Sequence, residues 1–344
     1  MSGARVLVAM SGGVDSSVAA ALLLEQGHDV TGVTLKLWGG ESDSGCCSVA
    51  DVEDARRAAA QLGIPHYVFN FTDEFEATVV APYVDAYASG QTPNPCVECN
   101  RWMKFGRLLA RAEALGFDAF ATGHHARIYR TEEGVYRLAR GADVAKDQSY
   151  VLAMLGGPEL RRVLLPVGEL TKAEVRAKAA ALGLRTAAKP DSQDLCFVTR
   201  GGRARFLETR LGAAPGPIVD SSGTLVGRHE GVARFTIGQR RGVGVASGER
   251  RFVVDLDATT ATVTLGRRED LLRDEIAVRD LAFVDERPGP GRDLLVQVRA
   301  HGTPVTGRLR GSRVRLAEPQ PRVAPGQVVA LYDGDLVLGS GIAA

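Results

Sequence analysis

The sequence predicts an α/β protein in which a doubly wound parallel sheet is followed by two smaller, mostly β domains. Two observations carry this prediction. Strand-like and helix-like runs alternate through the first 200 residues, and beyond them short β-type runs are separated by Gly, Asp and Pro. A chain of 344 residues has room for two or three domains. We place the domains at 1–200, 201–273 and 274–344.

The first domain is expected to alternate strands with helices. Apolar or β-branched runs predict strands at 5–10, 29–38, 66–71 and 118–128. Helix-forming residues predict helices at 17–27, 49–63 and 171–183, with a long helical region after residue 71. The first two of these helices end in Gly, and the third opens with a capping box from Thr171 to Glu174. Such alternation predicts a parallel sheet with right-handed crossovers.

The rest of the chain is expected to form small β barrels, or a barrel and a connecting piece. The runs that predict strands there are RFTIGQ, RRFVVDLD, TATVTLG, DLLVQVRA, TPVTGRLR, RVRLAE and GQVVALYDGDLVLGSG. The small, polar stretch ESDSGCCS at 41–48 is interpreted as a mobile loop.

Composition excludes several classes of protein. Hydrophobic residues make up 45% of the chain and charged residues 24%, as in ordinary globular proteins. The opening MSGARVLVAM has neither the basic start nor the long apolar run of a signal peptide, so we expect a cytoplasmic protein without a membrane partner. Five cysteines are too few, and odd in number, for a secreted disulfide framework.

Charge is unevenly distributed along the chain. Residues 1–100 hold 4 Lys or Arg and 13 Asp or Glu, whereas the remainder holds 38 and 28, for a net charge of +1. Arginine-dense pieces at 200–206, 239–242 and 248–252 carry part of the basic excess. Such a surface can bind nucleic acid, but from the charges alone an ordinary solvated surface is the better interpretation.

The strongest chemical motif is AMSGGVDSS at 9–17, directly after the first predicted strand. Its glycines allow a tight turn with exposed amides, and its serines and the next helix start add donors, so it predicts a phosphate cradle. The loop has no lysine and is therefore not a Walker motif. SGGVDS resembles the PP-loop of ATP pyrophosphatases, which split ATP between the α and β phosphates and pass AMP to a substrate oxygen. That resemblance implies pyrophosphate binding by the loop, with Asp15 a candidate to aid Mg²⁺.

The cysteines leave several interpretations open. Cys96 and Cys99 form one CxxC pair, but no second pair completes a zinc site, so no metal ligand is predicted. An inert buried thiol is the usual interpretation of a single cysteine such as Cys196. Cys46 and Cys47 have no role that the sequence supplies.

Several motifs occur in one order along the chain. They are SGGVDSS, TPNPCVECNRWMKF, GHHAR, KDQSYVL and PDSQDLCF, followed by FTIGQRRG and APGQVVALYDGD. Over almost the whole chain they closely resemble the bacterial tRNA-specific 2-thiouridylase family. The resemblance implies an adenine nucleotide alpha hydrolase-like PP-loop domain, a small central domain and a C-terminal β-barrel. It also implies an enzyme, a tRNA-uridine 2-sulfurtransferase that converts the wobble uridine, position 34 of tRNA, into 2-thiouridine.

The resemblance implies the chemistry as well. The uridine O2 attacks the α-phosphate of ATP, pyrophosphate leaves, and C2 becomes an electrophile with AMP as its leaving group. Cys196 is expected to carry a persulfide, loaded by a cysteine desulfurase or a sulfur-relay protein. Cys99, the second catalytic thiol, attacks C2 directly, or attacks the persulfide and releases hydrosulfide. Either route leaves a Cys99–Cys196 disulfide for a reductant to reset.

The resemblance also assigns binding residues. Those expected to hold ATP with Mg²⁺ are Ala9, Met10, Ser11, Gly12, Gly13, Val14, Asp15, Ser16, Leu35 and Gly123. Those expected to contact the anticodon arm of tRNA are Asn94, Pro95, Cys96, His124, Lys146, Asp147, Gln148 and Gln327. The uridine is expected to flip out against the first three, because its C2 is unreachable in a stacked base. The later arginines then become candidate phosphate contacts.

The chain departs from the family pattern at two places. Many relatives have Asp where this chain has Cys96, so a general acid/base role is not carried over to it. Cys96, Cys99 and Cys196 could instead hold an iron–sulfur cluster, and this alternative stays open. The stretch VRAHGTP at 298–304 is less basic and aromatic than in many relatives, so no tRNA contact is assigned to it.

Two further hypotheses stay open. Another PP-loop ligase would need neither Cys99 nor Cys196. A nucleotide-binding RNA-binding module without catalysis would release no pyrophosphate when given ATP and tRNA. Whichever hypothesis holds, the protein is expected to be a monomer.

Overall fold

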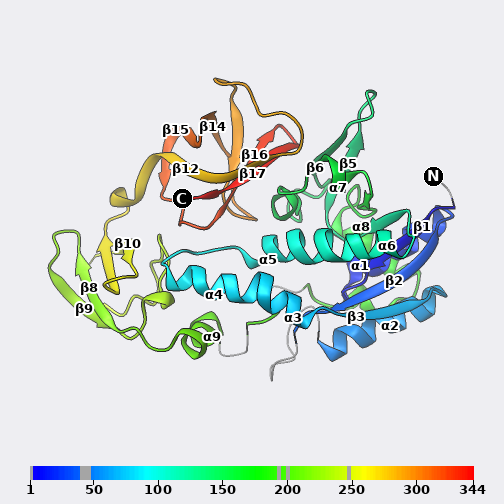
Figure 1. Ribbon diagram of the computed structural model, residues 1–344, viewed down its shortest axis with the longest axis horizontal. Coiled ribbons are helices and arrows are strands. Elements are labelled where there is room, and N and C mark those ends of the chain that lie inside the picture. The colour runs from blue at the N-terminus through cyan, green and yellow to red at the C-terminus, as the bar shows by residue number, and fades with distance from the viewer. Residues whose placement is uncertain (1–2, 39–47, 192–194, 199–201, 246–248) are drawn as a thin grey trace.

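The computed structural model describes residues 3–38, 48–191, 195–198, 202–245 and 249–344. The predicted loop at 41–48, with Cys46 and Cys47, lies outside these ranges except for its last residue. The strands form a five-stranded, a four-stranded and an eight-stranded sheet. Figure 1 shows the five-stranded sheet with its helices at one end of the molecule, the four-stranded sheet at the other, and a barrel above them. The predicted fold class is confirmed.

The first part is built on a parallel sheet with the strand order β3-β2-β1-β4-β7. Its strands are β1 (Arg5–Ala9), β2 (Asp29–Lys36), β3 (His66–Asn70), β4 (Ala119–Ala121) and β7 (Val163–Leu164). Strand order reverses between β1 and β4, and at such a point the loops after the two strands diverge and leave a crevice. A ligand site is therefore expected just beyond Ala9 and Ala121.

Helices cover both faces of this sheet. One face carries α1 (Val14–Glu25), α2 (Val49–Leu62) and α8 (Lys172–Ala181). Alternation along β1 shows the two faces, because Val6 and Val8 are buried against these helices whereas Leu7 is buried on the opposite side. The predicted capping box is present, since the Thr171 amide donates to Glu174 at 2.7 Å and the Glu174 amide donates back at 3.3 Å.

The predicted long helical region is two helices, separated at residues 89–94. The first joins α3 (Thr72–Phe75), η1 (Glu76–Val80) and α4 (Ala81–Ala88); the second joins α5 (Pro95–Glu98), η2 (Cys99–Leu108) and α6 (Leu109–Ala114). Both η1 and η2 have the wider π-helical winding. Such segments are rare in proteins, and those that do occur are often found at functional sites. The segment η2 begins at Cys99.

The predicted strand at 118–128 is divided by a loop. Its second half belongs to a hairpin, β5 (Ala126–Arg130) and β6 (Tyr136–Arg140), which leaves the parallel sheet. The hairpin instead extends the C-terminal sheet, because Ala139 pairs with Leu336. Short turns of helix complete this part: η3 (Ser149–Leu152), α7 (Gly157–Leu160) and η4 (Arg185–Ala188).

The middle part contains a helix that the sequence interpretation missed. This helix, α9 (Gly202–Leu211), buries Phe206 and Leu207 against the first part. The remaining elements are β8 (Gly216–Asp220), β9 (Leu225–His229), η5 (Val232–Arg234), β10 (Phe252–Asp257), β11 (Thr262–Gly266) and η6 (Glu269–Leu271). The prediction of a strand at RFTIGQ is wrong: Phe235 and Ile237 enter the core of this part from irregular backbone.

The last part is a closed barrel. Its strands are β12 (Leu272–Phe283), β13 (Leu294–Gln297), β14 (Val305–Arg310), β15 (Arg313–Pro321), β16 (Val328–Asp333) and β17 (Leu336–Ala343), and β12 pairs with β17 to close it. The barrel is attached to the first part by buried polar contacts. The Tyr150 hydroxyl donates to the Val328 carbonyl at 3.0 Å, and the Thr92 amide donates to the Pro325 carbonyl at 2.7 Å.

Candidate active site

The PP-loop lies in the crevice between β1 and β4. Gly12 has a φ of +73°, and a Cβ there would lie 2.2 Å from the Asp51 carbonyl oxygen, so only glycine fits this turn. The Ser16 hydroxyl holds the turn: it accepts from the Ser11 amide at 3.2 Å and donates to the Gly13 carbonyl at 3.1 Å. The first turn of α1, whose amides lack partners within the helix, therefore opens onto the crevice.

The loop after β4 packs directly on this turn. A Cβ at Gly123 would lie 2.5 Å from the Ser16 amide nitrogen and 2.6 Å from the Asp15 carbonyl carbon. The absence of a side chain at this position lets the two loops come together. Their residues form one continuous wall.

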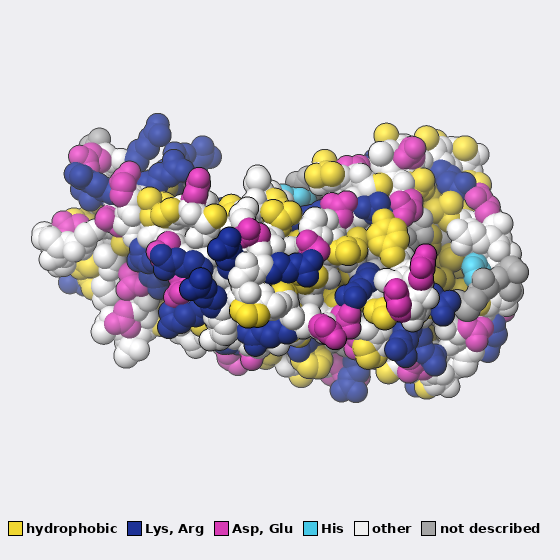
Figure 2. All heavy atoms as spheres, turned by 90° about the horizontal axis from the view of Figure 1, so that it is seen from above, with side chains coloured by type: hydrophobic (Ala, Val, Ile, Leu, Met, Phe, Trp, Pro, Cys, Tyr) yellow, Lys and Arg dark blue, Asp and Glu magenta, His cyan; other side chains and the backbone are white. Residues whose placement is uncertain are grey.

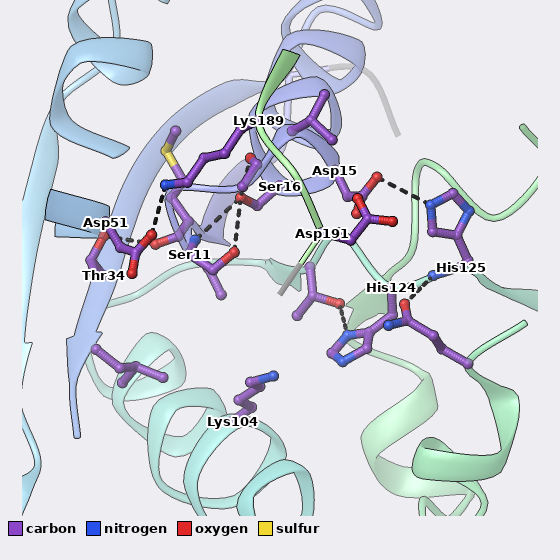
Figure 3. Close-up of a pocket in the computed structure, with 18 of the residues that line it drawn as sticks. Ser11, Asp15, Ser16, Thr34, Asp51, Lys104, His124, His125, Lys189 and Asp191 are labelled. Carbon is purple, nitrogen blue, oxygen red and sulfur yellow. Dashed lines mark hydrogen bonds and ion pairs between the residues drawn. The ribbon is translucent and has the colours of Figure 1, made fainter. Parts of the chain in front are cut away.

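The two loops line a cavity of about 670 Å³, drawn in Figure 3. This volume lies within the range of small-molecule sites. The predicted residues that line it are Ala9, Met10, Ser11, Gly13, Val14, Asp15, Ser16, Leu35, Gly123, His124, Lys146 and Gln148. Gly12 shapes the turn without being part of the lining.

Two carboxylates of the cavity share one lysine. The ammonium of Lys172 lies 2.7 Å from Asp15 and 2.8 Å from Asp191, and that of Lys146 lies 2.8 Å from Asp191. Burial would raise the pKa of Asp15, but hydrogen bonds from His125 and Lys172 outweigh it and lower the pKa. Burial of Asp191 is likewise outweighed by Lys146 and Lys172, which lower its pKa to about 2. Both carboxylates are therefore ionised at neutral pH and can interact with a cation.

Two more lysines lie on other sides of the PP-loop. Lys189 donates to the Gly12 carbonyl at 3.0 Å, to Asp51 at 2.7 Å and to Asp54 at 2.6 Å. Burial opposes the charge of Lys189, but hydrogen bonds to the two carboxylates outweigh it and raise its pKa. Lys104 points into the cavity from η2 (Figure 3). Lysines on several sides and helix-start amides at the base fit the phosphates of a nucleotide such as ATP.

The two histidines after Gly123 differ in their surroundings. His125 lies 3.2 Å from Asp15 through Nε2, and its backbone amide donates to the Gln148 side chain at 2.9 Å. His124 has its Nδ1 2.7 Å from the Thr122 hydroxyl. Burial, and then the electrostatic effects of Lys104 and His125, lower the pKa of His124 well below its usual value. His124 therefore faces the cavity as a neutral imidazole.

We expect His124 to remain neutral between about pH 6 and pH 8, a range in which an unperturbed histidine titrates. The physical reason is its burial beside Lys104. Ring-nitrogen NMR over this range would measure its protonation, with His124→Gln assigning the signal by its loss. A midpoint at or above the usual histidine value would contradict the prediction.

The three described cysteines differ in burial. Cys99 is buried at 9% exposure, Cys196 is half-buried against the same core, and Cys96 is exposed; all three are thiols. Phe197, next to Cys196, packs edge-on against Tyr83 with ring centroids 5.2 Å apart. Burial raises the pKa of the Tyr83 hydroxyl, and Tyr87 and then Cys96 add to this effect. Tyr83 of α4 therefore lies beside both cysteine-bearing segments.

The three described cysteines are not arranged as a metal site. Within the described residues, no group of three or more His, Cys, Asp or Glu side chains is placed to hold a metal ion. The geometry therefore gives no support to an iron–sulfur cluster at Cys96, Cys99 and Cys196.

The remaining predicted tRNA contacts lie at the junction of the parts or within the fold. Asn94 caps α5 by accepting from the Cys96 amide at 3.1 Å, and Pro95 is buried at the first helical position. Gln327 is half-buried and donates to the Thr92 carbonyl, which joins the barrel to the segment before Asn94. Asp147 is buried, and pairs with Arg140 at 2.8 Å. Their contacts with tRNA stay predictions.

Sequence reasoning missed several cavity residues. They are Asp51, Lys104, His125, Lys172, Lys189 and Asp191. Lys104 and Asp191 belong to motifs that the sequence analysis identified, so a signal for them was present. Lys172 follows the cap residue Thr171 and looks like an ordinary helix residue, so it had none. In the ranges described, no helix has both the length and the apolar character needed to cross a membrane.

Comparison with family models gives one match for each part of the chain. The tRNA methyl transferase HUP domain matches residues 4–200, the tRNA methyl transferase PRC-barrel domain matches 204–267, and the aminomethyltransferase beta-barrel domain matches 273–343. The first of these matches covers more than half of the chain.

Curated relatives match the chain along its length. A tRNA-specific 2-thiouridylase MnmA of Chloroflexus aurantiacus is 50% identical over 351 residues. Proteins of the same name from Roseiflexus castenholzii and Mycolicibacterium smegmatis are each 49% identical, over 365 and 354 residues. In all three cases 98% of this chain and 98% of the relative are covered.

These matches extend over all three parts of the fold and include the PP-loop cavity. They confirm the prediction that the chain is an enzyme, a sulfurtransferase. With half of its residues identical along the full length of such relatives, the chain belongs to the tRNA-specific 2-thiouridylase family.

Proposed function

We propose that this enzyme uses ATP to replace the C2 oxygen of uridine 34 in tRNA by sulfur. The observation that carries the proposal is the η2 segment, which begins at Cys99 and places Lys104 in the nucleotide cavity. In a π-helix residue i lies one turn from residue i+5, so the expected nucleophile is one turn from a phosphate-binding lysine. Nucleotide activation and sulfur transfer can therefore occur side by side.

Adenylation is the proposed first step. The amides of the PP-loop and Lys172 and Lys189 bind the phosphates. The Asp15 carboxylate would hold a Mg²⁺ ion beside the phosphates, where the ion would neutralise their charge. The uridine O2 attacks the α-phosphate, and pyrophosphate leaves in the anion-binding end of the cavity. Neutral His124 lies beside this reaction as a hydrogen-bonding group rather than a competing charge.

Sulfur transfer follows on the thiol side. Cys99 attacks the inner sulfur of the Cys196 persulfide, which forms the Cys99–Cys196 disulfide and releases hydrosulfide; hydrosulfide then displaces AMP from C2. In the alternative order, Cys99 first displaces AMP at C2. The terminal sulfur of the Cys196 persulfide then attacks C2 and displaces the Cys99 thiolate, which attacks the Cys196 sulfur, leaves the terminal sulfur on C2 and forms the Cys99–Cys196 disulfide. A thiolate must be reachable in each case. The packing of Phe197, next to Cys196, on Tyr83 of the core that also contains Cys99 supports this part of the proposal.

Basic side chains support tRNA binding. Figure 2 shows Lys and Arg side chains in several clusters along one face of the molecule, including its β-rich end. Such clusters neutralise phosphates, so binding of the anticodon arm is expected to weaken steeply with salt. A sulfur-relay partner or desulfurase, a monomeric state and a cytoplasmic location complete the proposal.

Nucleoside mass spectrometry tests the function. Unmodified tRNA would be incubated with the protein, ATP, Mg²⁺ and a persulfide-generating desulfurase, with and without air. One sulfur in place of one oxygen at uridine 34 would support the proposal. Thiolation that needs anaerobic, iron-reconstituted protein would favour the iron–sulfur alternative. ATP cleavage without thiolation would favour another PP-loop ligase. Absence of both ATP cleavage and thiolation would favour a binding module.

The variant Lys172→Met is expected to raise the Kd for ATP about 10- to 100-fold, as expected when a charged hydrogen-bond donor is lost from a phosphate site. It also leaves Asp15 and Asp191 without the cation between them. Calorimetric titration with a non-hydrolysable ATP analogue would measure the change.

A matched control lies on the same helix. Lys178 pairs with Glu25 at 2.8 Å on the surface of α8, and Lys178→Met removes the same charge away from the cavity. We expect the control to keep the wild-type Kd. Equal Kd values for the two variants would show that Lys172 does not bind the nucleotide.

A further inference from the structure

We propose that Cys96 is the resolving thiol of the catalytic pair. It exchanges with the Cys99–Cys196 disulfide and moves the disulfide to Cys96–Cys99, at the protein surface. The inference rests on the proposed function, because thiolation is what leaves a Cys99–Cys196 disulfide. It concerns how the enzyme is reset after each turnover.

The backbone places Cys96 and Cys99 at neighbouring positions of one helix. They lie three residues apart on one continuous helix, and the Cys99 amide donates to the Cys96 carbonyl, which closes the turn between them. Residues three apart on a helix have side chains on neighbouring positions, about 5–6 Å between Cβ atoms. Disulfides need a Cβ separation of about 3.5–4.5 Å, so a small adjustment of one helical turn suffices.

Cys96 is more exposed than Cys99 and Cys196, as expected for the thiol that brings the disulfide to the surface. Cys99 is 9% exposed, and Cys196 is half-buried against the same core. A disulfide between them lies against packed aromatic rings, where a reductant the size of a protein has poor access. Cys96 is exposed, so a disulfide that includes it can be approached from solvent.

Tyr83 relates the segment of Cys96 to that of Cys196. Cys96 adds to the electrostatic effects that raise the pKa of the Tyr83 hydroxyl, and the Tyr83 ring packs edge-on against Phe197, the residue after Cys196. Phe197 also packs on Phe75, with ring centroids 5.8 Å apart. The exchange therefore involves two segments that both lie near Tyr83.

The exchange balances without an added oxidant. The Cys96 thiolate attacks the Cys99 sulfur, the Cys99–Cys196 bond breaks, and Cys196 leaves as a thiolate that can be loaded again. One disulfide, Cys96–Cys99, replaces another, so the number of oxidised cysteines does not change. An external protein dithiol then reduces it to two thiols and becomes a disulfide itself.

Disulfide mapping tests the exchange directly. Wild-type protein would be oxidised with one equivalent of diamide, quenched by acid at successive times, alkylated and analysed by mass spectrometry. We expect the Cys99–Cys196 linkage to appear first and to be replaced by Cys96–Cys99. In Cys96→Ser the Cys99–Cys196 linkage should persist. A wild-type end state of Cys99–Cys196 would overturn the proposal.

A turnover measurement gives the second arm. With a protein dithiol as reductant, the ratio of the steady-state rate to the first-turnover rate should fall about 10-fold or more in Cys96→Ser. A small dithiol should restore this ratio, because a small molecule reaches the buried Cys99–Cys196 bond. An unchanged ratio would overturn the proposal. Absence of thiolation from a wild-type protein that still shows the diamide exchange would count against the proposed function instead.

Discussion

Replacing Cys99 or Cys196 by serine is expected to lower tRNA thiolation by about 10⁴-fold or more, the scale of loss when a covalent catalytic group is removed. A serine hydroxyl neither carries a persulfide nor leaves as a thiolate, and its pKa keeps it protonated at neutral pH. ATP binding should remain, because neither cysteine lines the nucleotide cavity. Nucleoside mass spectrometry and ATP calorimetry on the same samples would separate the two effects.

Folding needs a separate control for Cys99, because its side chain is buried and serine would bury a hydroxyl. Cys99→Ala removes the thiol without adding a polar group, so it should lose thiolation to the same extent with a Tm close to that of the wild type. Substantial thiolation by either Cys99 variant, or by Cys196→Ser, would show that sulfur does not pass through the two cysteines.

The PP-loop could be predicted from sequence because its determinants are local. A strand, two glycines and a helix start within a dozen residues specify the turn, and the structure places the loop at the carboxyl end of β1. The glycine at 123 carries less local signal. A glycine is needed there because two loops more than a hundred residues apart in sequence come into contact. Only the family resemblance indicated that Gly123 belongs to the site.

The lysines of the cavity could not be predicted in the same way. Lys104, Lys172 and Lys189 come from η2, α8 and the segment after η4. Lys104 belongs to a recognised motif, but nothing in its own stretch relates it to Lys172 and Lys189, which look like ordinary surface lysines. Their shared site is produced by the crossover topology of the sheet. The hairpin β5–β6 was hard to assign for a related reason, since its pairing partner β17 lies about two hundred residues away.

The middle part shows a different limit. The stretch that forms α9 was interpreted only as a basic segment because of its arginines, although Phe206 and Leu207 form a buried helix face. RFTIGQ has the composition of a strand, but its apolar residues pack from irregular backbone between β9 and β10. Composition identified RFTIGQ as structured and did not reveal α9, and tertiary packing decided the form of both stretches.

Substituting Gly123 by alanine is expected to raise the Kd for ATP about 100-fold or more and to lower the Tm by about 2–10 °C, since overpacking costs about 1–3 kcal/mol. The added methyl would lie 2.5 Å from the Ser16 amide nitrogen, and the atoms it meets are backbone, which cannot rotate away. The β4 loop must then move off the PP-loop and widen the site. Thermal denaturation and ATP calorimetry would measure the two effects.

Gly13 provides the matched control for this argument. It lies in the same loop, but its φ of −93° suits any residue, and a Cβ there would meet its nearest atom, the Ser11 hydroxyl, at 3.5 Å. Gly13→Ala should therefore keep the wild-type Tm, whereas Gly123→Ala should not. If both variants melted at the wild-type temperature, the two loops would not be in the contact that the structure gives them. A drop in Tm without loss of ATP affinity would instead place the nucleotide elsewhere than against the loop that contains Gly123.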